Sequence, residues 1–158
     1  MAGRALDYAH LSAGDAGPAI SHALTRTDLV MYAGASGDFN PMHHDEIAAQ
    51  QAGLPSVFGH GMFTAGFLAT AITDFVGIGS LKSYRVRFTK QTWPGEVLTT
   101  NVTVREKRAG NEVVLDCAVV NEHGETKIRG EAVAVLSLPL PVLICRRPIS
   151  RRSRSGTR

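Results

Sequence analysis

The chain has 158 residues, of which 44% are hydrophobic and 20% are charged, so we expect one domain with a sizeable core. Its formal net charge is +3, but six of its 17 basic residues follow Leu138, where no acidic residue occurs. The rest of the chain has more acidic than basic residues, so the charge does not indicate a nucleic-acid partner for the domain. The two cysteines fit neither a metal-ligand spacing nor a disulfide framework, and a reducing cytoplasm is the expected compartment.

The sequence contains no pattern typical of a signal peptide or a membrane span. Residues 1–17 have no long apolar run. The longest apolar stretch, from Met62 to Val76, is interrupted by three threonines and one aspartate. It is also shorter than the ~20 residues that a membrane span needs. We therefore expect a buried core helix there and no membrane partner.

The first half of the chain predicts one short strand and three helices. Thr25 and Asp28 supply capping residues for the first helix, which should end near Gly34 to Gly37. A second, short helix should end at the Gly-Leu-Pro of residues 53–55. The third helix, which begins at Gly59 to Gly61, is apolar on nearly every face, so we expect protein to surround it. The expected elements are a strand at 19–24 and helices at 25–37, 44–51 and 59–76.

After Gly79 the pattern becomes that of β-strands, because hydrophobic and polar residues alternate. Turn signals separate the strands at residues 94–95, 109–111 and 123–124. This pattern fits an antiparallel sheet with one face packed on a helix, so the periodicity predicts an α+β fold. On the polar face we expect, among others, Arg85, Arg87, Lys127 and Arg129. The positions expected to face the helix include Tyr84, Val86, Phe88, Leu98, Val102, Val104, Val113, Leu115, Cys117, Val119, Ile128, Ala132 and Ala134.

Asp38 and His43 are the candidate acid–base pair. Pro41 lacks an N–H and moves Asn40 towards an extended conformation, so a helix cannot easily continue between them. Gly37 adds backbone freedom just before the aspartate. We expect a tight polar bend that aims a carboxylate and an imidazole at one water molecule. For an isolated pair, the alternative is a helix-capping aspartate and a surface histidine.

The segment from Tyr32 to Ala49 resembles the active-site segment of the MaoC-like, or R-specific, enoyl hydratases and 3-hydroxyacyl dehydratases. Residues 59–62 and residues 84–96 resemble two further blocks of this family, in the expected order. The resemblance runs from about residue 11 to about residue 138, and it is strongest to small mycobacterial dehydratases that act on carrier-bound chains. The matching residues of the first segment are Tyr32, Gly34, Ser36, Gly37, Asp38, Asn40, Pro41, His43 and Ala49.

The resemblance implies a single hot-dog domain at residues 1–139, in which an antiparallel sheet wraps around one long central helix. It also implies a hydro-lyase of fatty acid metabolism that reversibly hydrates trans-2-enoyl thioesters to (R)-3-hydroxyacyl thioesters by syn addition of one water. No cofactor is expected. The acyl group would be carried by coenzyme A or by an acyl carrier protein. Related enzymes form dimers, so we expect a homodimer or a heterodimer with a similar subunit.

Within this resemblance, Asp38 is assigned as the base and His43 as the proton donor. The backbone N–H of Gly61 would stabilise the thioester carbonyl, because it is one of the unpaired donors in the first turn of the long helix. Alternatively, Gly59 and Gly61 only form a tight loop before that helix. The residues expected to support the site are Ser36, Asn40 and His60.

Three basic residues lie on the polar side of the first long strand or at its end: Arg85, Arg87 and Lys90. They could contact the phosphates of coenzyme A or of a carrier-protein phosphopantetheine. A solvated strand face is an equally good interpretation of each of them.

His44 and Asp45 follow the acid–base pair and suggest a metal site as an alternative. Adjacent histidines such as His43 and His44 seldom point to one ion, and no His-x-x-x-His helix spacing is present. We therefore expect no metal. Asp45 is better explained as the start of the following helix, where a negative charge is favoured.

Other functions remain open from the sequence. A thioesterase would share the fold, and a partner subunit without turnover would be free to lose Asp38 and His43, which are intact here. Residues 140–158 form a basic tail rich in Pro, Ser and Arg, which we expect to be disordered. A nucleic-acid or membrane-surface arm is the functional interpretation of this tail, but we expect an extension without a role.

Overall fold

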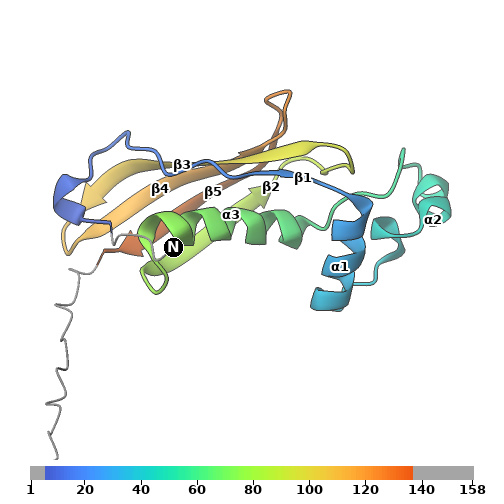
Figure 1. Cartoon of the computed structure of the whole chain (residues 1–158), viewed down its shortest axis with the longest axis horizontal. Helices are drawn as coiled ribbons and strands as arrows, with labels where there is room; N and C mark the ends of the chain where they lie inside the picture. Colours follow the sequence, from blue (N-terminus) through green and yellow to red (C-terminus); the bar gives the residue numbers. More distant parts are fainter. Residues whose placement is uncertain (1–5, 137–158) are drawn as a thin grey trace, which may run out of the picture.

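A five-stranded antiparallel sheet and one long helix form the body of the molecule (Figure 1). The structure is a computed structural model that describes residues 6–136. Predictions for the basic tail and for a domain boundary at residue 139 lie outside these residues. The elements are η1 (Tyr8–His10), β1 (Ser21–Ala23), α1 (Arg26–Ser36), η2 (Pro41–His43), α2 (Glu46–Gln51), α3 (Gly61–Val76), β2 (Leu81–Phe88), β3 (Val97–Arg108), β4 (Glu112–Val120) and β5 (Thr126–Val135).

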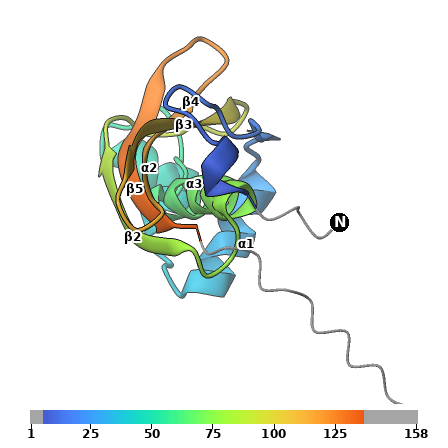
Figure 2. The same ribbon diagram turned by 90° about the vertical axis from the view of Figure 1, so that its left-hand side faces the viewer.

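The strand order of the sheet is β1-β3-β4-β5-β2, and every neighbouring pair is antiparallel. This order leaves β1 and β2 at the two edges. Figure 2 shows the sheet curving around α3, which lies along its concave face. The predicted α+β arrangement of a sheet around one long helix is therefore confirmed.

The core lies between α3 and the inner face of the sheet. Buried α3 residues such as Leu68 and Ile72 meet strand residues such as Leu98 and Leu115, and all four are fully buried. Their spacing follows the predicted helical and period-2 patterns. Tyr84 ties β2 to α3, because its hydroxyl donates to a main-chain carbonyl of the helix at 2.9 Å. Among the described helices, none combines the length and apolar character that a membrane crossing needs.

Helix α1 begins and ends with the capping that the sequence predicts. The Thr25 hydroxyl accepts from the Asp28 N–H at 3.1 Å, and the Asp28 carboxylate accepts from the Thr25 N–H at 2.7 Å. Gly37 closes the helix in the left-handed conformation, with φ 76°. The chain therefore turns sharply at the residue before Asp38, as expected.

The second helix is shorter than predicted. It begins at Glu46 rather than at His44, because the Asp45 carboxylate caps it by accepting from two main-chain N–H groups at 3.0 and 3.1 Å. The preceding Pro41–His43 segment forms a separate 3-10 turn. A proline at the first position and Asn40 as the N-cap explain why this turn forms.

Lys127 breaks the predicted alternation of β5. We expected it on the polar face of the sheet, but its side chain is 0% exposed. The register explains the difference, because Val119 pairs with Ile128 whereas the next residue, Val120, pairs with Thr126. Lys127 is the extra residue of a β-bulge, which turns a side chain away from its regular direction.

Candidate active site

The bend after α1 holds the Asp38 carboxylate in one orientation. The Asp38 N–H donates to the Ser36 hydroxyl at 3.2 Å, and this hydroxyl donates to the Tyr32 carbonyl at 2.7 Å. The Asn40 N–H donates to Asp38 Oδ1 at 3.2 Å. The other carboxylate oxygen, Oδ2, lies 4.0 Å from Nε2 of His43. The bend therefore brings the two candidate residues together, with the aspartate side chain half exposed at 52% and the histidine buried.

His43 is held by a main-chain carbonyl. Its Nδ1 lies 2.7 Å from the Phe58 carbonyl oxygen, and its ring packs edge-on against the Phe58 ring. Because a carbonyl oxygen can only accept, Nδ1 carries the hydrogen of the neutral ring. Nε2 then presents a lone pair towards Asp38. In this tautomer Nε2 can accept a proton from a water molecule placed between the two side chains.

His60 contacts both members of the pair. Its ring stacks on His43 with a centroid separation of 3.8 Å, and its Nε2–H donates to the Asp38 carbonyl oxygen at 3.1 Å. Burial lowers the pKa of His60 and so favours a neutral ring next to His43. Its Nδ1 is buried and has no hydrogen-bond partner within the described residues. The predicted supporting residues Ser36, Asn40 and His60 all contact the bend or the pair.

The same three side chains, Asp38, His43 and His60, bring metal-binding atoms within 4.8 Å of one another. An ion bound to an imidazole nitrogen lies in the plane of the ring, so two ligating rings should converge on it. The two imidazoles instead stack, at an interplanar angle of 30°. One nitrogen of each ring is also bonded to a carbonyl oxygen. The arrangement gives little support to a metal site, and its expected absence stays a prediction.

The N-terminus of α3 offers free main-chain donors. Its cap residue, His60, makes no side-chain cap hydrogen bond. Within residues 6–136, the N–H groups of Gly61 and Met62 have no acceptor. A side chain on Gly61 would meet the Phe88 ring, since a Cβ there would lie 3.1 Å from it. The glycine therefore keeps the space in front of these donors open.

A cavity of about 250 Å³ lies next to the pair, between the start of α3 and the segment that follows β2. Neither Asp38 nor His43 lines it. Phe58 and Gly61 do, and Phe58 also packs against His43, so the cavity lies beside the pair rather than around it. Its other lining residues include the apolar side chains of Phe88 and Ile128, together with Thr64, Lys90 and Thr92.

Lys90 is the only one of the three predicted phosphate contacts that lines the described cavity. Its ammonium group lies 2.5 Å from a carboxylate oxygen of Glu125. Arg85 and Arg87 alternate with Val86, which packs on the core, so both arginines lie on the outer face of the sheet. The structure therefore does not bring the arginines to the candidate pair.

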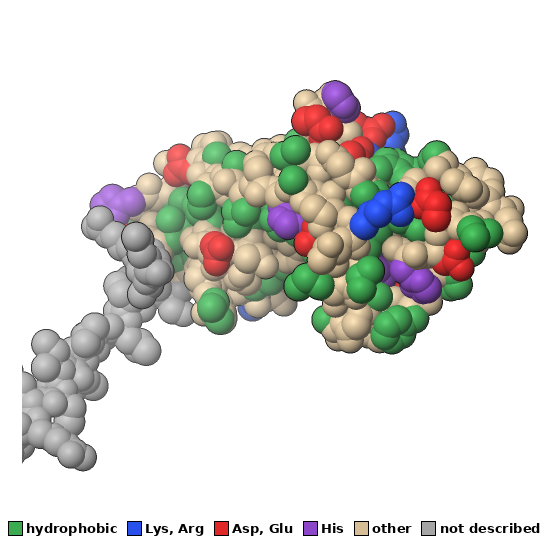
Figure 3. Space-filling model, turned by 45° about the vertical axis from the view of Figure 1, so that its right-hand side comes forward, with side chains coloured by type: hydrophobic (Ala, Val, Ile, Leu, Met, Phe, Trp, Pro, Cys, Tyr) green, Lys and Arg blue, Asp and Glu red, His purple; other side chains and the backbone are tan. Residues whose placement is uncertain are grey.

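Several hydrophobic side chains are exposed at the end of the molecule that carries the pair (Figure 3). Phe39 follows Asp38 directly and is 62% exposed, and Met62 follows Gly61 and is equally exposed. An apolar ligand could therefore contact protein on its way to the cavity. The exposed hydrophobic residues of α1, α2 and their connections are Val30, Met31, Phe39 and Ile47.

Two features of the site were not predicted from the sequence. The Phe58 carbonyl orients His43, but a main-chain oxygen carries no residue signature. The second feature is an ion network around Lys127, which contacts the segment lining the cavity. No spacing signal identifies it, because its members come from separate segments and meet only through the bulge in β5.

Comparison with known proteins shows that the chain is similar to hydratases and dehydratases. It is 27% identical over 119 residues to the (R)-specific enoyl-CoA hydratase of Rhodospirillum rubrum, a match that covers 74% of this chain and 83% of the relative. It is 40% identical over 80 residues to the 3-hydroxyacyl-thioester dehydratase Y of Mycobacterium tuberculosis, which covers 48% of this chain and 28% of that protein. The chain spans less than a third of the length of this and other curated relatives.

A solved structure of a hydratase is also similar to this chain. The R-hydratase PhaJ1 from Pseudomonas aeruginosa superposes with a TM-score of 0.76 at 28% identity, over 85% of this chain and 92% of that one. The family described as MaoC like domain matches residues 14–125. The resemblance stated from the sequence, with its hot-dog fold, is therefore confirmed, and the chain belongs to the MaoC-like domain family.

Proposed function

We propose that the chain catalyses the reversible hydration of trans-2-enoyl thioesters to (R)-3-hydroxyacyl thioesters. The observation that carries this proposal is the Asp38 carboxylate 4.0 Å from Nε2 of His43, a separation that leaves room for one shared water. Relatives named as hydratases and dehydratases support the hydro-lyase class. The pair lies at the same end of the folded molecule as the cavity and the free donors of α3.

In the hydration direction, the water gives one proton to Nε2 of His43, and its oxygen forms a bond to the β-carbon. The carbon–carbon π electrons move towards the thioester carbonyl and form an enolate. The imidazolium then returns the same proton to the α-carbon, so that a single water supplies both added groups on one face. Asp38 accepts a hydrogen bond from the water and stabilises the imidazolium. This proposal keeps His43 as the proton donor but differs from the assignment of Asp38 as the base, because Nε2 of His43 also takes the proton from the water.

The enolate oxygen needs hydrogen-bond donors while it carries negative charge. The Gly61 N–H is free of protein acceptors within residues 6–136 and lies in the first turn of a helix of 16 residues. The helix dipole adds positive potential at this end. A donor of this type is worth about 3 kcal/mol in a transition state.

The acyl chain is expected in the cavity, whose lining includes Phe58, Phe88 and Ile128. The carrier would then extend past Lys90, where its phosphate could replace the Glu125 carboxylate as the partner of the ammonium group. Coenzyme A and an acyl carrier protein share this phosphate chemistry, so both remain candidate carriers.

The test is incubation of the purified chain with crotonyl-CoA. Loss of the enoyl absorbance without release of free thiol, together with (R)-3-hydroxybutyryl-CoA as the product, is the expected result. Release of free thiol would instead identify a thioesterase. If a folded chain were inert on crotonyl-CoA and on longer enoyl thioesters, hydration by this chain alone would be ruled out. The partner-subunit interpretation would then be preferred.

A further inference from the structure

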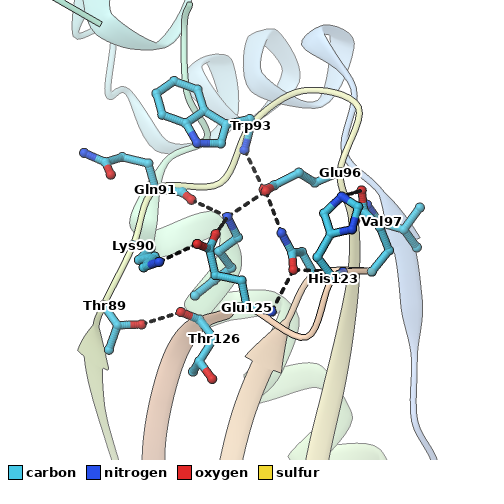
Figure 4. A network of polar contacts seen from close by, with 12 residues as sticks. Thr89, Lys90, Gln91, Trp93, Glu96, Val97, His123, Glu125 and Thr126 are labelled. Carbon is cyan, nitrogen blue, oxygen red and sulfur yellow. Dashed lines mark hydrogen bonds and ion pairs between the residues drawn. The ribbon is translucent and has the colours of Figure 1, made fainter. Parts of the chain in front are cut away.

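Lys127 has an unusual environment for a lysine. Its side chain is fully buried, and its ammonium group lies 2.9 Å from the Gln91 carbonyl oxygen. It also lies 2.6 Å from a carboxylate oxygen of Glu96 and 2.5 Å from one of Glu125. Figure 4 shows these three acceptors converging on one nitrogen. All three ammonium hydrogens therefore have a partner.

The network around this ammonium group is balanced in charge. Lys90 pairs with the second oxygen of Glu125, so two lysines meet the two carboxylates of Glu96 and Glu125. Burial by itself would lower the pKa of Lys127, but its hydrogen bonds to the Glu125 and Glu96 carboxylates outweigh burial and raise the pKa. The lysine therefore stays charged. A charged group in a protein interior often adds little stability compared with apolar packing, so the burial of Lys127 calls for another explanation.

The network fixes residues 89–96, the segment that connects β2 to β3. The ammonium group of Lys127 holds the Gln91 carbonyl, and the Lys127 carbonyl accepts from the Thr89 N–H at 2.9 Å. Glu96 uses its other oxygen to accept from the Trp93 N–H at 2.8 Å. One residue of β5 thus anchors the whole segment: its carbonyl holds Thr89, and its ammonium group holds Gln91 and Glu96.

The anchored segment in turn holds the loop that carries the active-site groups. The Thr92 carbonyl accepts from the Gly59 N–H at 2.8 Å, and the Trp93 ring packs edge-on against Phe58 at 6.0 Å. The Phe58 carbonyl sets the orientation of His43, and Gly61 begins α3 two residues after Gly59. The path from Lys127 to the candidate active site is therefore a continuous series of hydrogen bonds and packed rings.

We propose that Lys127 is a positioning residue of this site: through residues 89–96 it fixes the Phe58 carbonyl that orients His43 and the turn that presents the Gly61 N–H. The kinetic consequence of this inference rests on the proposed function, whereas its structural consequence does not. Small displacements matter for such groups, because an error of about 1 Å in a reacting geometry can cost on the order of 100-fold in rate.

The test replaces Lys127 by methionine, which keeps the length of the side chain but removes its charge and donors. The control is Lys107→Met, because Lys107 also donates to two main-chain carbonyls, those of Tyr8 and Leu11, each at 2.7 Å. Lys107 lies near the far end of β3 from residues 89–96. Both full-length variants are compared with the wild type at a temperature where all are folded.

We expect kcat for crotonyl-CoA hydration to fall about 10- to 100-fold in Lys127→Met and to stay within about twofold of the wild type in Lys107→Met. The imidazole ¹⁵N NMR signals of His43 give a second readout, which needs no activity. They should report the single Nδ1–H form in the wild type and in Lys107→Met, and a mixture of tautomers in Lys127→Met.

An unchanged kcat with unchanged His43 signals in Lys127→Met would overturn the inference. If this variant does not fold, Lys127→Met/Glu96→Gln removes a carboxylate that has lost its counter-ion, and the same two readouts apply to it. A wild type without hydratase activity would contradict the proposed function, and the NMR comparison would still decide the role of Lys127.

Discussion

In the proposed reaction, a side chain at residue 61 would occupy the space of the thioester carbonyl. We predict that Gly61→Ala lowers the rate of enoyl-CoA hydration at least about tenfold, because its methyl group crowds the free N–H groups at the start of α3. The new Cβ would lie 3.1 Å from the Phe88 ring, which is half exposed and can shift. The free energy of unfolding should therefore change by no more than about 1 kcal/mol.

Gly66→Ala is the matched control for this prediction. Residue 66 lies in the same helix, is exposed, and offers a Cβ no neighbour within 4 Å. This control should keep full activity and gain up to about 1 kcal/mol in helix stability. Equal activity in the two alanine variants, measured as initial rates beside urea unfolding curves, would argue against a role for the Gly61 N–H.

The bend between Asp38 and His43 could be predicted at the level of single residues. Gly37 and Pro41 restrict the backbone in ways that do not depend on the rest of the fold, and the structure has the turn where it was expected. The tautomer of His43 could not be predicted, because the Phe58 carbonyl that selects it lies 15 residues further along the chain. Only tertiary packing brings the two together.

At the scale of secondary-structure elements, the ion network at the start of β5 should make the free energy of unfolding depend on pH. Hydrogen bonds from Lys127 and then from Lys90 lower the pKa of the Glu125 carboxyl from its ordinary value of 4.5 to about 2. The unfolded chain therefore binds this proton more readily than the folded chain does. The stabilisation from Glu125 is complete above about pH 4.5 and is lost as the pH falls towards 2.

We predict that the free energy of unfolding falls less steeply between about pH 6 and pH 3 in Glu125→Gln than in the wild type. Urea unfolding curves recorded at several pH values measure this free energy for both proteins. Asp74→Asn is the control, since Asp74 makes no ion pair within the described part of the chain. Identical pH profiles for Glu125→Gln and the wild type would contradict the prediction.

The elements themselves were largely predictable from the sequence, and the main exception arises from pairing between strands. The Thr25 capping box and the alternation in β3 depend on neighbouring residues only, so both agree with the structure. Lys127 was misplaced because the bulge in β5 arises from pairing with β4 and leaves no trace in the period-2 pattern. The ion network that follows from the bulge was missed for the same reason.

At the scale of the whole molecule, the sheet ends in exposed edges. β2 is an edge strand of eight residues whose last residue, Phe88, is 50% exposed. Exposed edges of this kind invite pairing with another strand. We therefore predict a dimer in which β2 strands of two copies pair, with twice the mass of the chain in sedimentation equilibrium.

A monomer at micromolar concentration would contradict the homodimer. The heterodimer that the sequence left open would then be tested by adding candidate subunits of similar fold and measuring mass and activity together. The α+β class was predictable from the change of hydrophobic period after Gly79, and the sheet around one helix was implied by the family resemblance. Pairing between chains depends on surfaces that the sequence pattern does not identify.

The most direct test of the account is the rate of crotonyl-CoA hydration by the wild type, Asp38→Asn and His43→Ala, each verified as folded by circular dichroism. We predict turnover by the wild type and a loss of at least about 100-fold in both variants, because general acid–base groups contribute on the order of 10² to 10⁴. Wild-type turnover that survives either substitution would contradict the assignment of Asp38 and His43 as the catalytic pair.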